Sequence, residues 1–265
     1  MKVIQLNIDK VCVIGDIHSS PKELEFVISK ANANGIDKFI FLGDLWDRGY
    51  DPNGVVDIIN DLVVSEKATV IVGNHDNKFI RHFNGNKVNI APQQQETLSK
   101  LTSASIDKFK NIFQEEIVAV FDPNAKIFMS HAAAGRPLNM LRHMLDDVNR
   151  EYHSLNPITL ADMFQNVTQI NVAKKRVGNF MYGITNGDTI NGLPVRMPIT
   201  KSETDTLDDW LYVHGHTHSN NLFPEDGNKH VMCLDFSCGE PPHGKLCGML
   251  VKDGMVSVEN VIFSS

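Results

Sequence analysis

Residues 11–18 have the sequence VCVIGDIH, a short apolar run that ends in a glycine, an aspartate and a histidine. Similar runs occur at 38–44 and 68–74, where apolar residues lead into Gly-Asp and Gly-Asn. Helix-forming segments separate the three runs, so the order is strand, helix, strand, helix, strand. This order predicts a sheet with parallel strands joined by crossover helices.

Both connecting segments carry helix signals. In the first, Ser20 stands where an N-cap is expected, a proline and a capping glutamate follow, and Gly35 marks the expected end. The second follows the sequence DPNG at 51–54 with an apolar face. Since the carboxyl ends of parallel strands open onto a shared crevice, function is expected at these strand ends.

The second half of the chain repeats the pattern. Strand-like runs at 125–129, 210–213 and 231–234 lead into SH, HGHTH and an aspartate, and closing strands are predicted at 248–251 and 255–261. Residues 135–208 are predicted to form a cap inserted over the crevice of a single domain, 1–265, because the ligand-like residues resume after them. Within the cap, helices are expected at 138–145 and near 158–164.

Composition restricts the class of protein. The chain has 265 residues, of which 42% are hydrophobic and 22% are charged, which excludes a disordered tail, a collagen-like rod and a small disulfide scaffold. The formal net charge of −7 argues against a protein that coats long nucleic-acid backbones. It leaves open a local polyanion site, because carboxylates around divalent cations also count as negative.

The four cysteines form no zinc-binding pair and no dense disulfide framework, so reduced and mostly buried thiols are expected. No signal peptide and no run long enough to span a bilayer is visible. These features predict a cytoplasmic protein that needs no membrane and no obligate protein partner.

Polar side chains gather at the predicted strand ends. Five of the eleven histidines lie there, four of them directly beside glycine or serine, although a single histidine at such a place is more often structural. Carboxylates, imidazoles and an amide from separate segments make a ligand set suited to two adjacent first-row divalent ions. The polar residues at the predicted strand ends are Asp16, His18, Asp44, Asp47, Arg48, Asn74, His75, Asp76, His131, His216 and His218.

The blocks that hold these residues resemble the signatures of the calcineurin-like metallophosphoesterases. They are GDIH (15–18), GDLWDRG (43–49), GNHD (73–76), SH (130–131) and GHTH (215–218). The resemblance implies an α/β fold of two packed mixed β-sheets flanked by helices, and an enzyme that hydrolyses phosphate esters. Trp46, inside the second block, is expected either below the site or stacked on substrate.

The resemblance also implies a binuclear metal centre, with Mn²⁺ first and Fe, Zn, Co or Ni as alternatives. Asp44 would bridge the two ions. The first ion would be held by Asp16, His18 and Asp44, completed by His218, and the second by Asp44, Asn74, His131 and His216.

Two such cations, roughly 3.5–4 Å apart, lower the pKa of a bridging water and clamp phosphoryl oxygens, so that hydroxide attacks phosphorus in line with the leaving oxygen. His75, held by Asp47, is the predicted acid for that oxygen. Arg48 is predicted to bind phosphate, and its alternative is a salt bridge to Asp47 or Asp51.

Two further residues follow from the resemblance. Arg196 would reach phosphate from the cap, or else be exposed in a turn. Asp235 would orient a metal-bound histidine, or else cap a loop at a strand end.

A finer resemblance, to the phosphatase module of bacterial RNA-repair polynucleotide kinase-phosphatases and related bacterial and phage phosphatases, rests on several segments. These are GNHDNKFIR (73–81) with Gly85 and ETL (96–98), YG (182–183), GLPVR (192–196), CLD (233–235) and GKL (244–246). The chain lacks the kinase phosphate loop, and AAAG (132–135) and EPPH (240–243) depart from the module near the expected mouth.

The leading prediction is a phosphomonoesterase acting on RNA or DNA 3′ ends or nucleotides, with 2′,3′-cyclic phosphates as further substrates. The alternatives are a protein serine/threonine phosphatase, a dinucleoside polyphosphate hydrolase and a non-catalytic metal-binding scaffold.

Overall fold

The computed structural model describes most of the chain outside the predicted cap. The described residues are 1–133, 141–143, 146, 149, 168–172, 174–183, 185–190, 193–196, 210–224, 227–240 and 244–264. Of the helix predicted at 138–145, residues 141–143 are described and helical, whereas the helix predicted near 158–164 lies outside the described residues. The cap therefore stays a prediction.

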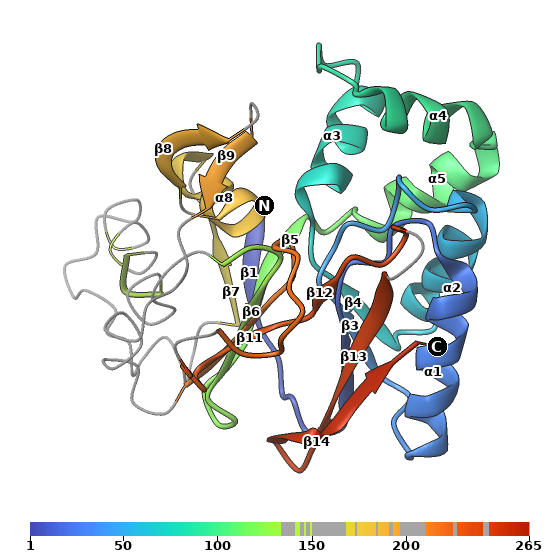
Figure 1. Cartoon of the computed structure of the whole chain (residues 1–265). Coiled ribbons are helices and arrows are strands. Elements are labelled where there is room, and N and C mark those ends of the chain that lie inside the picture. Colours follow the sequence, from blue (N-terminus) through green and yellow to red (C-terminus); the bar gives the residue numbers. More distant parts are fainter. Residues whose placement is uncertain are drawn as a thin grey trace.

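Two mixed β-sheets form the framework (Figure 1). The first has the order β11 (Val231–Cys233), β10 (Leu211–His214), β6 (Ile127–Ser130), β5 (Ile117–Asp122), β1 (Lys2–Gln5) and β7 (Gln169–Asn171). The second has the order β12 (Asp235–Phe236), β13 (Lys245–Lys252), β2 (Val11–Ile14), β3 (Phe39–Phe41) and β4 (Ala68–Val70), and β14 (Met255–Phe263) pairs with β13.

Helices cover the outer faces of both sheets. The second sheet is flanked by α1 (Pro21–Ala33), α2 (Pro52–Val64) and α5 (Ser103–Ile112), with α3 (Asn74–Phe83) and α4 (Pro92–Lys100) beyond them (Figure 1). Helix α8 (Lys174–Tyr182) packs against the first sheet, and the separate hairpin of β8 (Thr185–Ile190) and β9 (Leu193–Arg196) follows it in the chain. The predicted fold class, two mixed sheets with flanking helices, is confirmed.

Strand β2 shows why the sheets pack on both faces. All four of its residues are buried. Because side chains alternate along a strand, Cys12 and Ile14 join the core beneath the helices, whereas Val11 and Val13 join the core between the two sheets. A continuous apolar run is what a strand covered on both sides requires.

The parallel register of β2, β3 and β4 brings their carboxyl ends to one edge. Ile14 pairs with Phe41, and Phe41 pairs with Val70. Strands β6 and β10 of the first sheet are also parallel, with Met129 beside Val213. The polar residues that follow these strands therefore meet from both sheets.

The predicted capping box at the start of α1 is wrong. The Ser20 hydroxyl makes no cap hydrogen bond and donates instead to the backbone oxygen of His18, at 3.0 Å. It thereby holds the loop after β2, while Pro21 begins the helix. The second helix starts as its sequence indicates, because Asp51 accepts from the Gly54 backbone nitrogen at 3.0 Å.

Trp46 lies in the apolar core and not against a substrate. Its side chain is buried and stacks on Phe109, with ring centroids 3.9 Å apart. Its indole nitrogen donates to the Pro52 backbone oxygen at 2.9 Å. This ring anchors the GDLWDRG loop to α2 and α5.

The four cysteines are buried and unpaired, as expected. None of the described helices is long and apolar enough to cross a membrane.

Candidate metal centre

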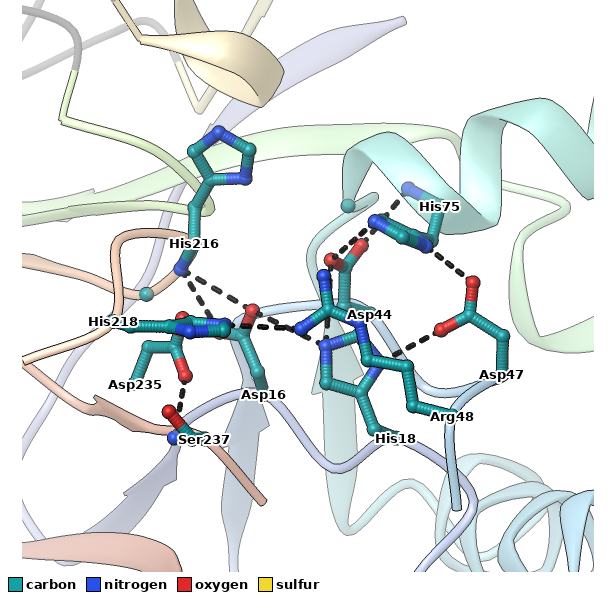
Figure 2. A network of polar contacts seen from close by, with 12 residues as sticks. Asp16, His18, Asp44, Asp47, Arg48, His75, His216, His218, Asp235 and Ser237 are labelled. Carbon is teal, nitrogen blue, oxygen red and sulfur yellow. Dashed lines mark hydrogen bonds and ion pairs between the residues drawn. The ribbon is translucent and has the colours of Figure 1, made fainter. Parts of the chain in front are cut away.

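Two overlapping groups of ligating side chains occupy the meeting point of the strand ends. Potential ligand atoms of Asp16, His18 and Asp44 lie within 4.8 Å of one another, and those of Asp44, His131 and His216 do the same. Asp44 belongs to both groups. The predicted members of the centre therefore come together from both sheets, and Figure 2 shows most of them.

The backbone around these residues is unusual. Asp44, His18 and His216 have φ values of 51°, 44° and 67°, in the left-handed region that residues other than glycine rarely adopt. Such conformations persist only where the surrounding contacts hold them, and they concentrate at functional sites.

Glycines leave room for the carboxylates. A Cβ atom on Gly73 would lie 2.2 Å from Asp44 Oδ1, and one on Gly215 would lie 2.0 Å from Asp16 Oδ1. The GNHD and GHTH blocks therefore need glycine at positions 73 and 215, because a carboxylate lies where any larger residue would place its Cβ atom.

Substituting Gly215 with alanine is expected to displace the Asp16 carboxylate and weaken metal binding by roughly 10–100-fold. The dependence of turnover on metal concentration measures this. Gly178→Ala is the matched control, because a Cβ atom there has no neighbour within 4 Å. Equal metal dependence in both variants would contradict the role given to Gly215.

The unprotonated ring nitrogen of His131 faces other hydrogen-bond acceptors. Its Nδ1 lies 2.9 Å from the Leu42 backbone oxygen and donates to it, which leaves Nε2 unprotonated in the neutral ring. Burial lowers the pKa of His131, so the neutral ring is favoured. Yet Nε2 lies 2.9 Å from Asn74 Oδ1 and 3.5 Å from Asp44 Oδ2, both acceptors. Acceptors that converge in this way fit a cation held between them.

His18 has the same arrangement. Its Nδ1 lies 3.0 Å from Asp47 Oδ1, which fixes the proton there and turns Nε2 toward the carboxylates of Asp16 and Asp44, at 4.0 and 3.9 Å. Carboxylate oxygen and imidazole nitrogen together suit Mn, Fe, Zn or Co ions. The residues present therefore fit divalent metal ions.

The electrostatics of Asp16 and Asp44 also favour a bound cation. Burial, and then the charges of Asp235 and Asp44, raise the pKa of Asp16 well above its ordinary value. For Asp44 burial acts in that direction too, but the neighbouring histidines outweigh it and hold the pKa below its ordinary value. Crowded buried carboxylates are costly unless positive charge compensates them.

His75 forms the predicted pair with Asp47. Its Nδ1 is hydrogen-bonded to Asp47 Oδ2, and the same carboxylate holds His18 through its other oxygen (Figure 2). Burial would lower the pKa of His75, but the charges of Asp44 and Asp47 raise it to about 9. The side chain is 19% exposed, so its Nε2 can meet a substrate.

Asp76 ties the strand ends together. It accepts hydrogen bonds from the backbone nitrogens of Asp44, Leu45 and Gly73, at 2.7, 3.0 and 3.0 Å. The carboxylate is fully buried, and burial together with Asp44 raises its pKa to about 7. The sequence placed Asp76 only among the polar residues at the strand ends, whereas the structure shows that it braces the Asp44 loop.

Because Asp76→Ala leaves three buried N–H groups without a partner, we expect it to lower the free energy of unfolding by about 3 kcal/mol. Urea denaturation measures the loss. Asp57→Ala, which removes an exposed carboxylate paired with Lys108, should cost less than about 1 kcal/mol. Equal losses in the two variants would rule out the brace.

Arg48 has a partner that the sequence did not indicate. Its Nη1 lies 2.8 Å from Glu240 Oε1 and 2.9 Å from His218 Nε2, so the alternative of a salt bridge to Asp47 or Asp51 is wrong. No sequence signal pairs Glu240 with Arg48, because 192 positions separate them.

His218 lies outside both ligating groups among the described residues. Its ring is 42% exposed, and Nε2 lies 3.7 Å from Asp235 Oδ2. Asp235 is buried and accepts from the Ser237 backbone nitrogen at 2.9 Å. Arg196 is the last residue of β9, and its side chain is outside the described part of the chain.

The comparisons with known proteins agree with this arrangement. The sequence profile of the calcineurin-like phosphoesterases matches residues 9–235, which include every residue of the two ligating groups. The chain belongs to the calcineurin-like phosphoesterase family. It is a metal-dependent hydrolase that acts on phosphate esters.

Among curated proteins, the asymmetrical bis(5′-nucleosyl)-tetraphosphatase PrpE of Bacillus mycoides is 27% identical over 252 residues, covering 91% of this chain and 89% of that protein. The protein of the same name from Oceanobacillus iheyensis is 36% identical over 112 residues, covering 39% of this chain and 45% of that protein.

Among solved structures, a protein serine/threonine phosphatase from Saccharomyces cerevisiae has a TM-score of 0.58 at 16% identity, covering 99% of this chain and 82% of that chain. That likeness concerns the fold alone. The finer resemblance to RNA-repair phosphatases stays a prediction.

Proposed function

We propose that this protein hydrolyses dinucleoside tetraphosphates asymmetrically, at a binuclear centre built around Asp44. The observation that carries the chemistry is the place of Asp44 in both ligating groups. The substrate class is supported by the similarity to the Bacillus mycoides tetraphosphatase, which extends over nine-tenths of both chains. Mn²⁺ is the proposed ion, with the other first-row ions as alternatives.

The first ion would be held by Asp16, His18 and Asp44, and the second by Asp44, Asn74, His131 and His216. When bound there, the ions supply Lewis-acid polarisation of phosphoryl oxygens and a water of lowered pKa. The described thiols do not compete as nucleophiles, since burial raises the pKa of Cys12 and Cys238 to about 12.

The side chains of the protein perform the remaining steps. His75 donates the proton at Nε2 to the leaving oxygen, while Asp47 holds its Nδ1 and so fixes the direction of the ring. Arg48 exchanges the Glu240 carboxylate for a phosphate oxygen when substrate arrives.

Three sequence predictions remain proposals here. Part of residues 135–208 caps the site and Arg196 reaches phosphate from that cap, whereas β7 and α8 within this range belong to the first sheet and its core. Asp235 positions a histidine at the edge of the centre, and its contact with His218 supports this role. We place His218 beside the proposed ligands, because it contacts Arg48 and not the two ligating groups.

The direct test compares kcat/KM with added Mn²⁺ on four substrates: a dinucleoside tetraphosphate, an RNA 3′-phosphate end, a 2′,3′-cyclic nucleotide and a phosphoserine peptide. We expect the tetraphosphate to be preferred at least about tenfold, a difference of about 1.4 kcal/mol. Preference for the RNA end or the cyclic nucleotide would replace the proposal with end-healing chemistry. Preference for the peptide would indicate a protein phosphatase, and inactivity on all four would revive the non-catalytic scaffold.

A further inference from the structure

A polar groove of about 300 Å³ borders the metal centre. One wall is the α4 helix, with Gln93, Glu96, Thr97 and Lys100, and the opposite side is formed by Arg48-Gly49 and Gly239-Glu240. We call it the α4 groove. Nothing in the proposed chemistry uses α4, so the groove needs an explanation of its own.

The floor of the α4 groove lies directly on His18. A Cβ atom on Gly49 would lie 2.0 Å from the His18 backbone oxygen, and one on Gly239 would lie 2.7 Å from the same atom. Two glycines that line the groove therefore lie directly against the backbone of His18, whose side chain is a proposed metal ligand.

Arg48 connects the two spaces. Its guanidinium Nη1 lies 2.9 Å from Nε2 of His218, a residue of the GHTH block beside the centre, and it also lines the groove. A phosphate bound by Arg48 at the centre would thus direct its next substituent into the α4 groove.

The charges on the walls balance. Lys100 pairs with Glu96 at 2.8 Å, and Arg48 pairs with Glu240 at 2.8 Å. When Arg48 exchanges Glu240 for a phosphate oxygen, Lys100 faces two glutamates, and this excess of negative charge disfavours a polyphosphate chain. A neutral polar group therefore suits the groove better.

The hydrogen-bonding side chains of the groove indicate which neutral polar group it binds. Glu96 engages Lys100 through one oxygen, so its second oxygen can accept from a hydroxyl, whereas the second oxygen of Glu240 lies 3.8 Å from His218 Nδ1. Gln93 adds an amide that donates and accepts. The described lining holds no aromatic ring on which a base could stack. This set matches a sugar diol and not a nucleobase.

We infer that the α4 groove binds the ribose of the nucleotide unit whose phosphate reacts, an inference that rests on the proposed function. In asymmetric cleavage water adds to phosphorus, a P–O–P bridge breaks, and the departing oxygen takes a proton. The nucleoside then lies one phosphate from the broken bond, which agrees with a groove whose glycines lie directly against the backbone of His18. The volume, near the lower end for ligand sites, suits one nucleoside.

The test measures inhibition of p-nitrophenyl phosphate hydrolysis by AMP, UMP, 2′,3′-dideoxyadenosine monophosphate and inorganic phosphate. Because the sugar supplies the contacts, AMP and UMP should inhibit with similar constants. Both should bind about tenfold more tightly than the dideoxy nucleotide and phosphate. Equal inhibition by AMP and its dideoxy analogue would overturn the inference.

Two variants locate the contact. Gln93→Phe, which fills the groove, and Glu96→Gln, which removes a carboxylate, should weaken AMP inhibition about tenfold and leave the inhibition constant of phosphate unchanged. Gln95→Phe is the matched control, since Gln95 is exposed on the same helix and does not line the groove. If Gln93→Phe behaves like this control, the groove is not the sugar site. A wild-type protein that is inhibited by AMP in this pattern but leaves the tetraphosphate intact would overturn only the proposed function.

Discussion

Asp44→Asn is expected to lower kcat about a thousandfold at saturating metal, the effect of losing several kcal/mol of charge stabilisation. Asp44 is the one described carboxylate that belongs to both ligating groups, and an amide cannot supply its negative charge. The variant should fold, because asparagine keeps an oxygen for the hydrogen bond that Asp44 Oδ1 accepts from the His75 backbone nitrogen, at 2.9 Å.

The measurement pairs kcat with metal content by elemental analysis. Asp57→Asn, an exposed carboxylate on α2, is the control and should match the wild type. Normal turnover in Asp44→Asn would show that Asp44 does not join the two proposed ions, and the account of the centre would fail with it.

His75→Ala is expected to reduce turnover of alkyl phosphates by about 10³-fold, since a positioned acid contributes roughly 10²–10⁴-fold. The loss for p-nitrophenyl phosphate should be under about tenfold, because nitrophenolate leaves without a proton. Metal content should not change, as His75 lies outside both ligating groups.

The difference between the losses of turnover on the two substrates distinguishes a lost proton donor from general damage to the site. His82→Ala, an exposed histidine on the same helix, provides the comparison and should leave both rates unchanged. An equal fall on both substrates in His75→Ala would assign this residue to substrate binding instead of proton transfer.

The strands and site residues that were predicted correctly depend on local sequence patterns. The apolar runs that became β2 and β3 are buried on both faces, and a strand of that kind needs no knowledge of its partners to be recognised. The residues after them were found because a glycine and a polar side chain follow each run and because these blocks resemble the family signatures. The structure adds that Gly73 and Gly215 leave room for the carboxylates of Asp44 and Asp16.

The remaining features depend on contacts between distant segments. Ser20 has an N-cap sequence, yet its hydroxyl serves the His18 loop, a choice made by tertiary packing. The Arg48–Glu240 ion pair and the α4 groove join segments far apart in the chain, so no local pattern announces them. Strand β1 was not predicted either, because its pairing with β5 joins distant segments. Strand β5 was also missed, although it is a fully buried run of the kind that local rules recognise.

The most direct test of the central claim is anomalous diffraction at the manganese edge from crystals grown with Mn²⁺. We expect two peaks that share Asp44, one beside Asp16 and His18 and the other beside Asn74, His131 and His216. A single peak, or peaks that Asp44 does not touch, would contradict the binuclear centre on which the proposed function depends.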